Sequence, residues 1–366
     1  MQIQQFSFLR NKDGSFSSFT KFSRQQDPSL WWVFPLKFLL LQLFLIGLLI
    51  VRVGIILAVL FVGFLAWAYQ EIKPPPPKIC GSPGGPPVTA PRIKLRDGRH
   101  LAYKEHGIPR DRAKYKIVFV HGFDCCRHDV AIAATLSPDV IESLGIYIVS
   151  IDRPGYGESD PNPNQTQKSL PYDIMELADQ LAGAALIAPV SNPWWPGFPA
   201  NLSNQVFYNG PPRDQWTLLV SHYTPWLTYW WNTQNLFPAS SAVAYEPSLF
   251  NSQDTQLITS YLAKRKEYQG QVRQQGEFES IHRDMIVGFG KWEFDPMDLE
   301  NPFPGNEGWV DLWQGDEDGL IPLPMQRYIA QKLPWVRYHE LPGAGHMFPY
   351  VGDMGNQIVK ALLLKD

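Results

Sequence analysis

Four loops of this 366-residue chain carry polar side chains directly after short apolar runs. Each of the four loops contains either a histidine or carboxylate residues, which are common proton-transfer groups in enzymes. The loops are, in chain order, residues 121–123 (HGF), 152–160 (DRPGYGESD), 316–322 (DEDGLIP) and 342–346 (PGAGH). These residue types at the ends of strand-like runs are candidates for acid–base chemistry.

The elements that would hold these loops are strands that alternate with helices. Apolar or β-branched runs precede the loops at 116–120, 146–151, 312–315 and 336–341, and residues 130–144 are compatible with a helix. Ahead of them, 92–94 and 100–105 indicate a hairpin that turns at Asp97-Gly98. This alternation predicts an α/β fold with a mostly parallel sheet and helices on both faces.

Taken together and in order, the four motifs resemble those of the α/β-hydrolase superfamily. The resemblance covers residues 92–366 and is greatest to plant membrane-anchored esterase-like or lipase-like members with a cap domain. It implies a serine hydrolase that cleaves carboxylic or lipid esters without a cofactor or a metal. The three cysteines (Cys80, Cys125 and Cys126) show no metal-type spacing with histidine.

The resemblance also implies a role for individual residues. His346 would be the general base, and Asp318 would orient it and stabilise its charge. Asp316 is the competing acid, although Asp318 stands at the usual distance before the Ile-Pro turn. The backbone N–H of Phe123, which follows the His-Gly pair, would donate to the oxyanion. His121 is expected to be structural and to bond the loop backbone.

The segment that should carry the nucleophile is missing from this pattern. After the predicted helix at 171–181, the family has a turn, a buried strand, a G-x-S-x-G elbow and a helix, ~35 residues in all. Here Leu181 leads directly into 182–190, which resembles the following strand. No G-x-S-x-G, G-x-D-x-G or G-x-C-x-G occurs in residues 92–366. Ser191 is a poor substitute, because Val190, Asn192 and Pro193 flank it where an elbow needs small residues.

Loss of a central strand would leave two sheet edges with unpaired backbone groups, at a cost of about 1–3 kcal/mol per buried group. The sequence therefore predicts a hydrolase-like chain that is inactive, as a pseudoenzyme or a splice isoform would be. The alternative is a function that is not enzymatic: a membrane-anchored binding module. An epoxide-hydrolase-like activity would need an aspartate nucleophile on the same missing elbow.

A long apolar stretch precedes the domain. Residues 36–69 contain only two charges, Lys37 and Arg52. This predicts a transmembrane segment, preferably a single span at 47–69, with a hairpin that turns near Arg52 as the alternative. Residues 1–35 are expected to be a disordered tail, with Trp31-Trp32 as an interfacial anchor, and 70–91 a Pro/Gly-rich linker.

Flanking charges and two glycosylation sequons, at Asn164 and Asn201, lean toward a lumenal domain in the endoplasmic reticulum or another endomembrane. The net charge of −3 and the absence of a basic run argue against nucleic-acid binding. Residues 191–280, rich in Trp, Phe, Tyr and Pro, match a cap that would suit an apolar ester. Most of these aromatics could equally pack the core of the cap itself.

Overall fold

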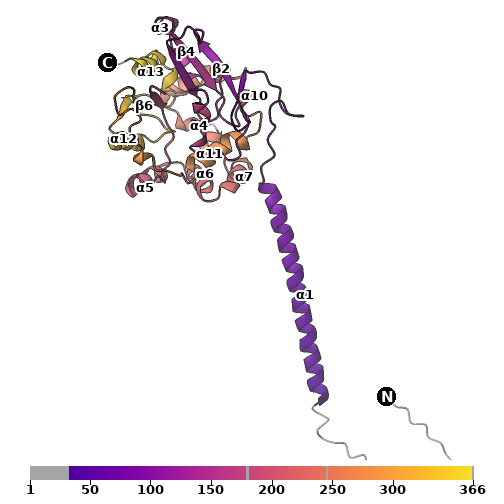
Figure 1. Cartoon of the computed structure of the whole chain (residues 1–366). Helices are drawn as coiled ribbons and strands as arrows, with labels where there is room; N and C mark the ends of the chain where they lie inside the picture. The colour runs from indigo at the N-terminus through magenta and orange to yellow at the C-terminus, as the bar shows by residue number, and fades with distance from the viewer. Residues whose placement is uncertain (1–32, 179–180, 245, 365–366) are drawn as a thin grey trace, which may run out of the picture. The chain divides into compact units, whose positions relative to one another are not determined.

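The computed structural model describes residues 33–178, 181–244 and 246–364 (Figure 1). The chain divides into two compact units, one ending at Ala68 and one running from Tyr69 to Asp366. Residues 1–32, which hold most of the expected tail and its anchor Trp31-Trp32, lie outside the described residues.

The first unit is dominated by one continuous helix, α1 (Val33–Ile72), of 40 residues. By length and composition Pro35–Ile72 is able to cross a membrane. The hairpin alternative is wrong, because the helix runs unbroken through Val51, Arg52 and Gly54. A single glycine among apolar helix formers lowers helix propensity by only about 1 kcal/mol and supplies no turn. At 1.5 Å per residue, 40 residues extend about 60 Å, twice the hydrocarbon thickness of a bilayer.

The strands of the second unit confirm the predicted α/β fold class. The first sheet has the order β1-β2-β4-β3. Its strands are β1 (Arg92–Lys94), β2 (His100–Gly107), β3 (Tyr115–Val120) and β4 (Ile146–Ile151). β1 and β2 form the predicted hairpin, with Lys94 opposite His100 and Gly98 at a φ of 91° in the turn. β3 and β4 are parallel, and Val120 is paired with Ile151, so their loops leave the same edge.

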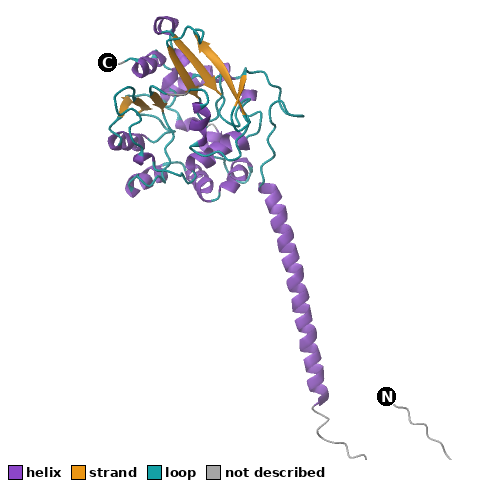
Figure 2. Ribbon diagram, in the orientation of Figure 1, coloured by secondary structure: helices purple, strands orange, loops and turns teal. Residues whose placement is uncertain are grey.

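The second sheet is parallel and has the order β5-β6-β7. Its strands are β5 (Ala184–Ile187), β6 (Val310–Gly315) and β7 (Val336–Leu341). Figure 2 shows the strands as two separate groups with helices packed around them. Among the described residues the sheet is therefore not continuous: β3 and β5 each have a neighbour on one side only.

Burial along the strands reflects this break. β4 and β6, which have neighbours on both sides, are buried at almost every position. In β3 only Ile117 is buried, and in β5 no residue is, with Leu186 40% exposed. Apolar strands that lie in the middle of a domain are normally buried on both faces. Those next to the break are instead partly open.

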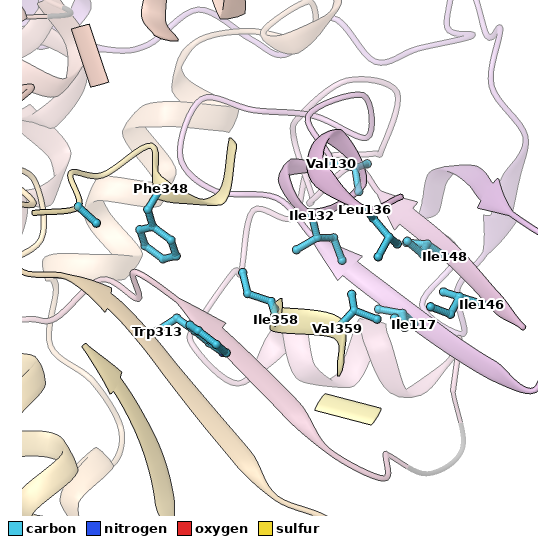
Figure 3. Packing of buried hydrophobic residues seen from close by; sticks show 11 residues of the cluster. Ile117, Val130, Ile132, Leu136, Ile146, Ile148, Trp313, Phe348, Ile358 and Val359 are labelled. Carbon is cyan, nitrogen blue, oxygen red and sulfur yellow. The ribbon is translucent and has the colours of Figure 1, made fainter. Parts of the chain in front are cut away.

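Helix α13 (Met354–Leu363) joins the two sheets through one apolar cluster. Ile358 and Val359 of α13 lie between Trp313 on β6 and Ile117 on β3 (Figure 3). Both side chains are at most 1% exposed. The two sheets thus share a core although they share no backbone ladder.

Two predicted helices differ from those in the structure. Residues 130–144 form two helices, α2 (Ala131–Thr135) and α3 (Pro138–Leu144). Proline disfavours helical backbone at the residue before it, and Ser137 caps α3 by accepting from the N–H of Val140. The helix expected at 171–181 is α4 (Ser169–Met175) and is shorter. Only Ile174 and Leu177 of this segment pack on a core cluster, whereas Tyr172 and Met175 are exposed.

The remaining helices build the cap and the outer face of the second sheet. Between β5 and β6 lie α5 (Ala200–Asn209), α6 (Pro212–Tyr223), a 3-10 turn (Pro225–Leu227), α7 (Thr228–Thr233), α8 (Ser241–Ala244), α9 (Ser252–Arg265), α10 (Gln269–Val272), a π-helical turn (Phe278–His282) and α11 (Arg283–Phe289). Helix α12 (Leu323–Lys332) connects β6 to β7.

The second half of the Pro/Gly-rich linker is docked on the domain. The N–H of Lys78 donates to the carbonyl of Gln275, and the N–H of Cys80 donates to Oε1 of Gln275 at 3.0 Å. Further along, the N–H groups of Thr89 and Ala90 donate to Oε2 of Glu158 at 2.7 and 2.9 Å. Only residues 73–77 separate α1 from the first docked residue.

The broken sheet predicts an unusual pattern of amide hydrogen exchange. Alternate amides of β3 face the break, so they should exchange faster than the amides of β4, which has partners on both sides. β5 should likewise exchange faster than β6. Hydrogen–deuterium exchange of the intact chain followed by mass spectrometry measures both pairs. Equal protection of β3 and β4 would show that another segment pairs with the open edge.

Candidate active site

An aspartate and a histidine meet where β6 and β7 end. The loop after β6 carries Asp318, and the loop after β7 carries His346. The strands are parallel neighbours with Gly315 opposite Leu341, so both loops leave the same edge of the sheet. Nδ1 of His346 lies 2.9 Å from Oδ2 of Asp318. This is the geometry in which a carboxylate orients an imidazole and stabilises its charged form.

The Asp318 carboxylate is held in place from three sides. Its Oδ1 accepts hydrogen bonds from the N–H groups of Leu320 and Ile321, at 2.8 and 2.9 Å. Gln314 donates to Oδ2 at 3.2 Å. Burial alone would raise the pKa of Asp318, but the hydrogen bond and charge of His346 and the two backbone donors outweigh it and lower that pKa. Asp318 is therefore an anion whose direction is fixed.

For the His346 ring the same two influences, burial and the partner's charge, act on the pKa in the opposite directions. Its burial disfavours the charged form, but the hydrogen bond and charge of Asp318, with a smaller contribution from Asp254, raise its pKa above the ordinary value of 6.5. When Nδ1 keeps its proton and donates it in a hydrogen bond to Asp318, Nε2 of the neutral ring is the atom able to accept a proton. Within the described part of the chain, no hydrogen bond to Nε2 of His346 is formed.

Asp254 of α9 anchors the histidine loop. Its Oδ2 accepts from the N–H of His346 at 2.9 Å, and its Oδ1 accepts from the N–H of Met347 at 2.8 Å. Asp254 is fully buried, and Asn251 caps α9 by accepting from its N–H. A Cβ on Gly345 would lie 2.3 Å from Oδ2 of Asp254, so only glycine permits this approach. Sequence reasoning missed Asp254, because the Asn-x-x-Asp pattern there indicates only the start of a helix.

The backbone N–H of Phe123 makes no hydrogen bond with any other described residue. This leaves it open as a donor, as an oxyanion site requires. The next residue, Asp124, fixes the loop: it has a φ of 53° and its carboxylate pairs with Arg265 of α9 and with Arg273. The loop that carries Phe123 is thus also tied to the cap.

The loop at 152–160 supports the site and contributes no exposed reactive group. Asp152 is buried and accepts from the N–H and the guanidinium of Arg127. Arg153 forms an ion pair with Asp284 of α11. As predicted for His121, its ring bonds loop backbone: Nε2 accepts from the N–H of Arg153 at 3.0 Å, and Nδ1 lies 2.8 Å from the carbonyl of Gly122.

Each alternative acid or nucleophile is occupied by another partner. Asp316 accepts from the N–H of Gly343 at 2.7 Å. The Ser191 hydroxyl is buried and accepts from Nε2 of Gln326 on α12 at 2.7 Å. Ser159 is buried and donates to the carbonyl of Asp152 at 2.7 Å. Cys125 lies close to Phe123 in sequence, but burial raises the pKa of its thiol to about 12, so it stays neutral.

A cavity of about 600 Å³ lies away from these residues. Trp309 and Trp335, two of its lining residues, directly precede β6 and β7, whereas Asp318 and His346 follow the opposite ends of these strands. Within the described ranges, no group of three or more His, Cys, Asp or Glu side chains could hold a metal ion.

No family model and no curated protein matches the sequence. Solved structures with a similar fold include an esterase from Thermogutta terrifontis, with 18% identity and a TM-score of 0.43, covering 75% of this chain and 96% of that chain. An enol-lactonase from Burkholderia xenovorans LB400 has 15% identity and a TM-score of 0.45, with coverages of 70% and 93%. An epoxide hydrolase structure described as belonging to the α/β-hydrolase superfamily, from metagenomes of hot environments, has 15% identity and a TM-score of 0.44. The match covers 76% of this chain and 100% of that chain. These likenesses concern the fold alone.

Removing the Asp254 carboxylate should destabilise the domain. In Asp254→Ala two backbone N–H groups lose their acceptor, at about 1–3 kcal/mol each, so the free energy of unfolding should fall by about 2–6 kcal/mol. Urea unfolding of the variant measures the loss. Asp298→Ala is the matched control, because Asp298 is exposed. A loss no larger than that of the control would show that the histidine loop does not depend on Asp254.

The Asp318–His346 pair also predicts a pH dependence. The pKa of His346 is raised in the folded chain, so its contribution to stability is fully present below about pH 6.5 and is lost as the pH rises through the raised value. His346→Gln should therefore reduce the free energy of unfolding more near pH 6 than near pH 9. Burial lowers the pKa of His106, so His106→Gln should show the opposite trend. Urea titrations at both pH values measure this difference, and an equal loss for His346→Gln at both would contradict the pairing.

Proposed function

We propose that this chain is a membrane-anchored relative of the α/β-hydrolases that keeps an acid and a base but has no nucleophile, and therefore does not act as a serine hydrolase. The observation that carries the proposal is the Asp318–His346 pair, in which Nε2 of His346 has no hydroxyl or thiol partner among the described residues. An acid and a base without a nucleophile assist water at most. In triad hydrolases, removal of the nucleophile leaves only residual catalysis.

The break in the sheet supports the loss of a segment between Leu181 and Ala182. β3 and β5 are the strands that the missing strand would join, and both have an open edge. Leu186 on β5 and Leu181 just before it are 40% and 55% exposed, as expected where a covering element is gone. A strand, a nucleophile elbow and a helix inserted there would pair with both edges and cover these side chains.

The activity proposed for relatives that keep the elbow is hydrolysis of a carboxylic or lipid ester with an apolar acyl group. An aromatic-rich cap favours such a substrate. Several cap aromatics pack on one another: Trp195 is stacked with Phe198 and contacts Trp292, and both Trp195 and Phe198 are buried. Trp195 and Phe198 pack in the apolar cluster that joins the start of the cap to β6 and α12, so only the remaining aromatics are available to a ligand.

The two alternatives differ in what they need from the missing segment. Epoxide hydrolysis would require an aspartate on the elbow, which is the segment proposed to be lost. A non-catalytic binding module requires only a folded cap and open loops. The second is favoured for this chain by the open N–H of Phe123 and by the His346 side chain, which is 33% exposed.

A fluorophosphonate probe tests the absence of a nucleophile. We expect no labelling of the intact chain and no esterase activity that depends on His346, because no hydroxyl is positioned for deprotonation. Insertion of a strand, a G-x-S-x-G elbow and a helix between Leu181 and Ala182 should restore both. Stoichiometric labelling of the unmodified chain, abolished by Ser191→Ala, would identify Ser191 as the nucleophile and overturn the proposal.

Membrane anchorage by α1 is part of the same proposal. The full chain should stay in the membrane pellet after alkaline carbonate washing, because burying about 20 apolar residues in the bilayer is effectively irreversible. A chain that begins at Lys73 keeps every docked linker residue and should be released. Release of the full chain would contradict a transmembrane α1.

A lumenal position of the domain is proposed from the flanking charges and the sequons. Asn164 and Asn201 are both exposed, so either is open to glycosylation. A mobility shift after glycosidase treatment of the full chain supports this orientation. Digestion of the domain by protease added outside intact microsomes reverses it.

A further inference from the structure

One part of the cap is almost free of charge. Residues 190–239 contain two charged residues, Arg213 and Asp214, whereas about a quarter of the residues in an average globular protein are charged. Both have partners: Arg213 forms an ion pair with Glu246, and Asp214 accepts from the N–H of Ser241. The surface built by this segment therefore presents almost no free charge to its surroundings.

The exposed residues of α6 and the 3-10 turn after it are all apolar or aromatic. In residues 212–227 these are Pro212, Trp216, Tyr223 and Trp226, the last three 58%, 65% and 61% exposed. Trp216 and Tyr223 are seven residues apart and so share one stripe of the helix. A surface helix normally points its polar side to water and its apolar side to the core. Here the exposed stripe is aromatic.

Neighbouring elements carry further exposed aromatic and apolar side chains. α5 and α7 pack against α6, and the three lie next to one another at one end of the domain (Figure 1). Tyr208 on α5 and Leu236 after α7 are 68% and 81% exposed. We call the five residues Tyr208, Trp216, Tyr223, Trp226 and Leu236 the cap ridge.

Ring contacts hold the cap ridge from beneath. Tyr208 contacts Phe207, which contacts Trp194, and Trp194 in turn contacts Tyr223. Trp216 contacts Trp231. Three of the exposed rings, those of Tyr208, Trp216 and Tyr223, therefore contact half-buried rings directly or through one another.

The chemistry of this surface fits the interface between water and lipid. Trp and Tyr combine a large apolar ring with a polar N–H or O–H and concentrate at the headgroup level of bilayers. Because the ridge presents almost no charge, moving it into this region carries little desolvation cost. An exposed apolar surface of this kind on a soluble protein marks a contact site.

The short segment between α1 and the domain, residues 73–77, favours a bilayer as the partner of the cap ridge. Lys78 is already hydrogen-bonded to Gln275, so only residues 73–77 are free between α1 and the domain. Four of these five are prolines, and an extended polyproline segment rises about 3.1 Å per residue, or about 15 Å in all. If α1 spans a membrane, the domain is confined to the surface of that membrane.

We propose that the cap ridge inserts into the headgroup region of the bilayer that α1 spans. This rests on the proposed membrane anchorage and adds a second, peripheral contact to it. The domain is then fixed at two points, at its tether and at its cap, and the cap that would admit an apolar ester faces the lipid phase.

Quenching by lipid-borne nitroxides tests the contact. The full chain is reconstituted in phosphatidylcholine nanodiscs at one chain per disc, with and without lipids that carry a nitroxide near the headgroup. A fluorophore is attached to Tyr223→Cys or Trp226→Cys, and to Tyr172→Cys as the control. Tyr172 is 63% exposed but lies on α4, outside the cap. The unsubstituted chain measures background labelling of the native cysteines.

We expect the nitroxide lipid to quench the fluorophore at 223 and 226 but not at 172. Trp216→Glu in the Tyr223→Cys chain should abolish that quenching while the chain stays in the disc, because the new charge would have to be desolvated. Absence of lipid quenching at 223 and 226 overturns the proposal, as does protection of these sites from a water-soluble quencher without lipid quenching, which indicates a protein partner.

The same experiment separates this inference from its premise. If the full chain does not enter the discs at all, the anchorage by α1 is wrong. If it enters and the fluorophores at 223 and 226 behave like the one at 172, the anchorage holds and only the cap contact is wrong. Hydrogen–deuterium exchange of residues 212–227 in the unsubstituted chain, with and without lipid, provides a readout that needs no substitution.

Discussion

The absence of a backbone ladder between β3 and β5 is the constraint under which the rest of the domain is organised. In a continuous parallel sheet, hydrogen bonds join every neighbouring pair of strands. Here the packing of α13 against both sheets replaces them, with Ile358 and Val359 between Trp313 and Ile117 (Figure 3). Apolar packing is non-directional, so it holds two sheets together but does not set their register as a ladder does. The relative placement of the two groups of loops is therefore less strictly fixed than in a closed sheet.

Polar contacts from the cap compensate for part of this freedom. Asp254 holds the histidine loop, Arg265 and Arg273 hold Asp124 beside Phe123, and Asp284 binds Arg153 and Tyr156. These contacts link the cap to loops from both sheets. Each involves a buried or half-buried charge, which is costly to leave unpaired and therefore specifies one arrangement. The cap therefore links the two sheets through their loops, in addition to covering the site.

The sequence allowed the strands, the hairpin and the loop positions to be predicted because these depend on local pattern. β4 and β7 occupy the predicted ranges, and the loops after β6 and β7 bring Asp318 to His346. Asp254 could not be predicted in this way, because it lies 92 residues from His346 and its role depends on how the cap packs. The division of 130–144 into two helices was in principle readable at Ser137-Pro138. The length of α4 was not, since it depends on what the helix packs against.

The docked linker changes where the domain begins. Gln275 receives the N–H of Cys80 on its oxygen, while its Nε2 donates to the carbonyls of Gly157 and Ser159. Glu158, between those two residues, accepts from Thr89, Ala90 and Arg127. Cutting the chain at Arg92, where the first strand starts, would remove the donors to Oε1 of Gln275 and to Oε2 of Glu158, and would leave Glu158 with Arg127 alone. The folded domain therefore starts near Lys78, ahead of its first strand. A segment whose composition is that of a spacer is part of the domain, because it supplies hydrogen-bond donors that no later described residue replaces.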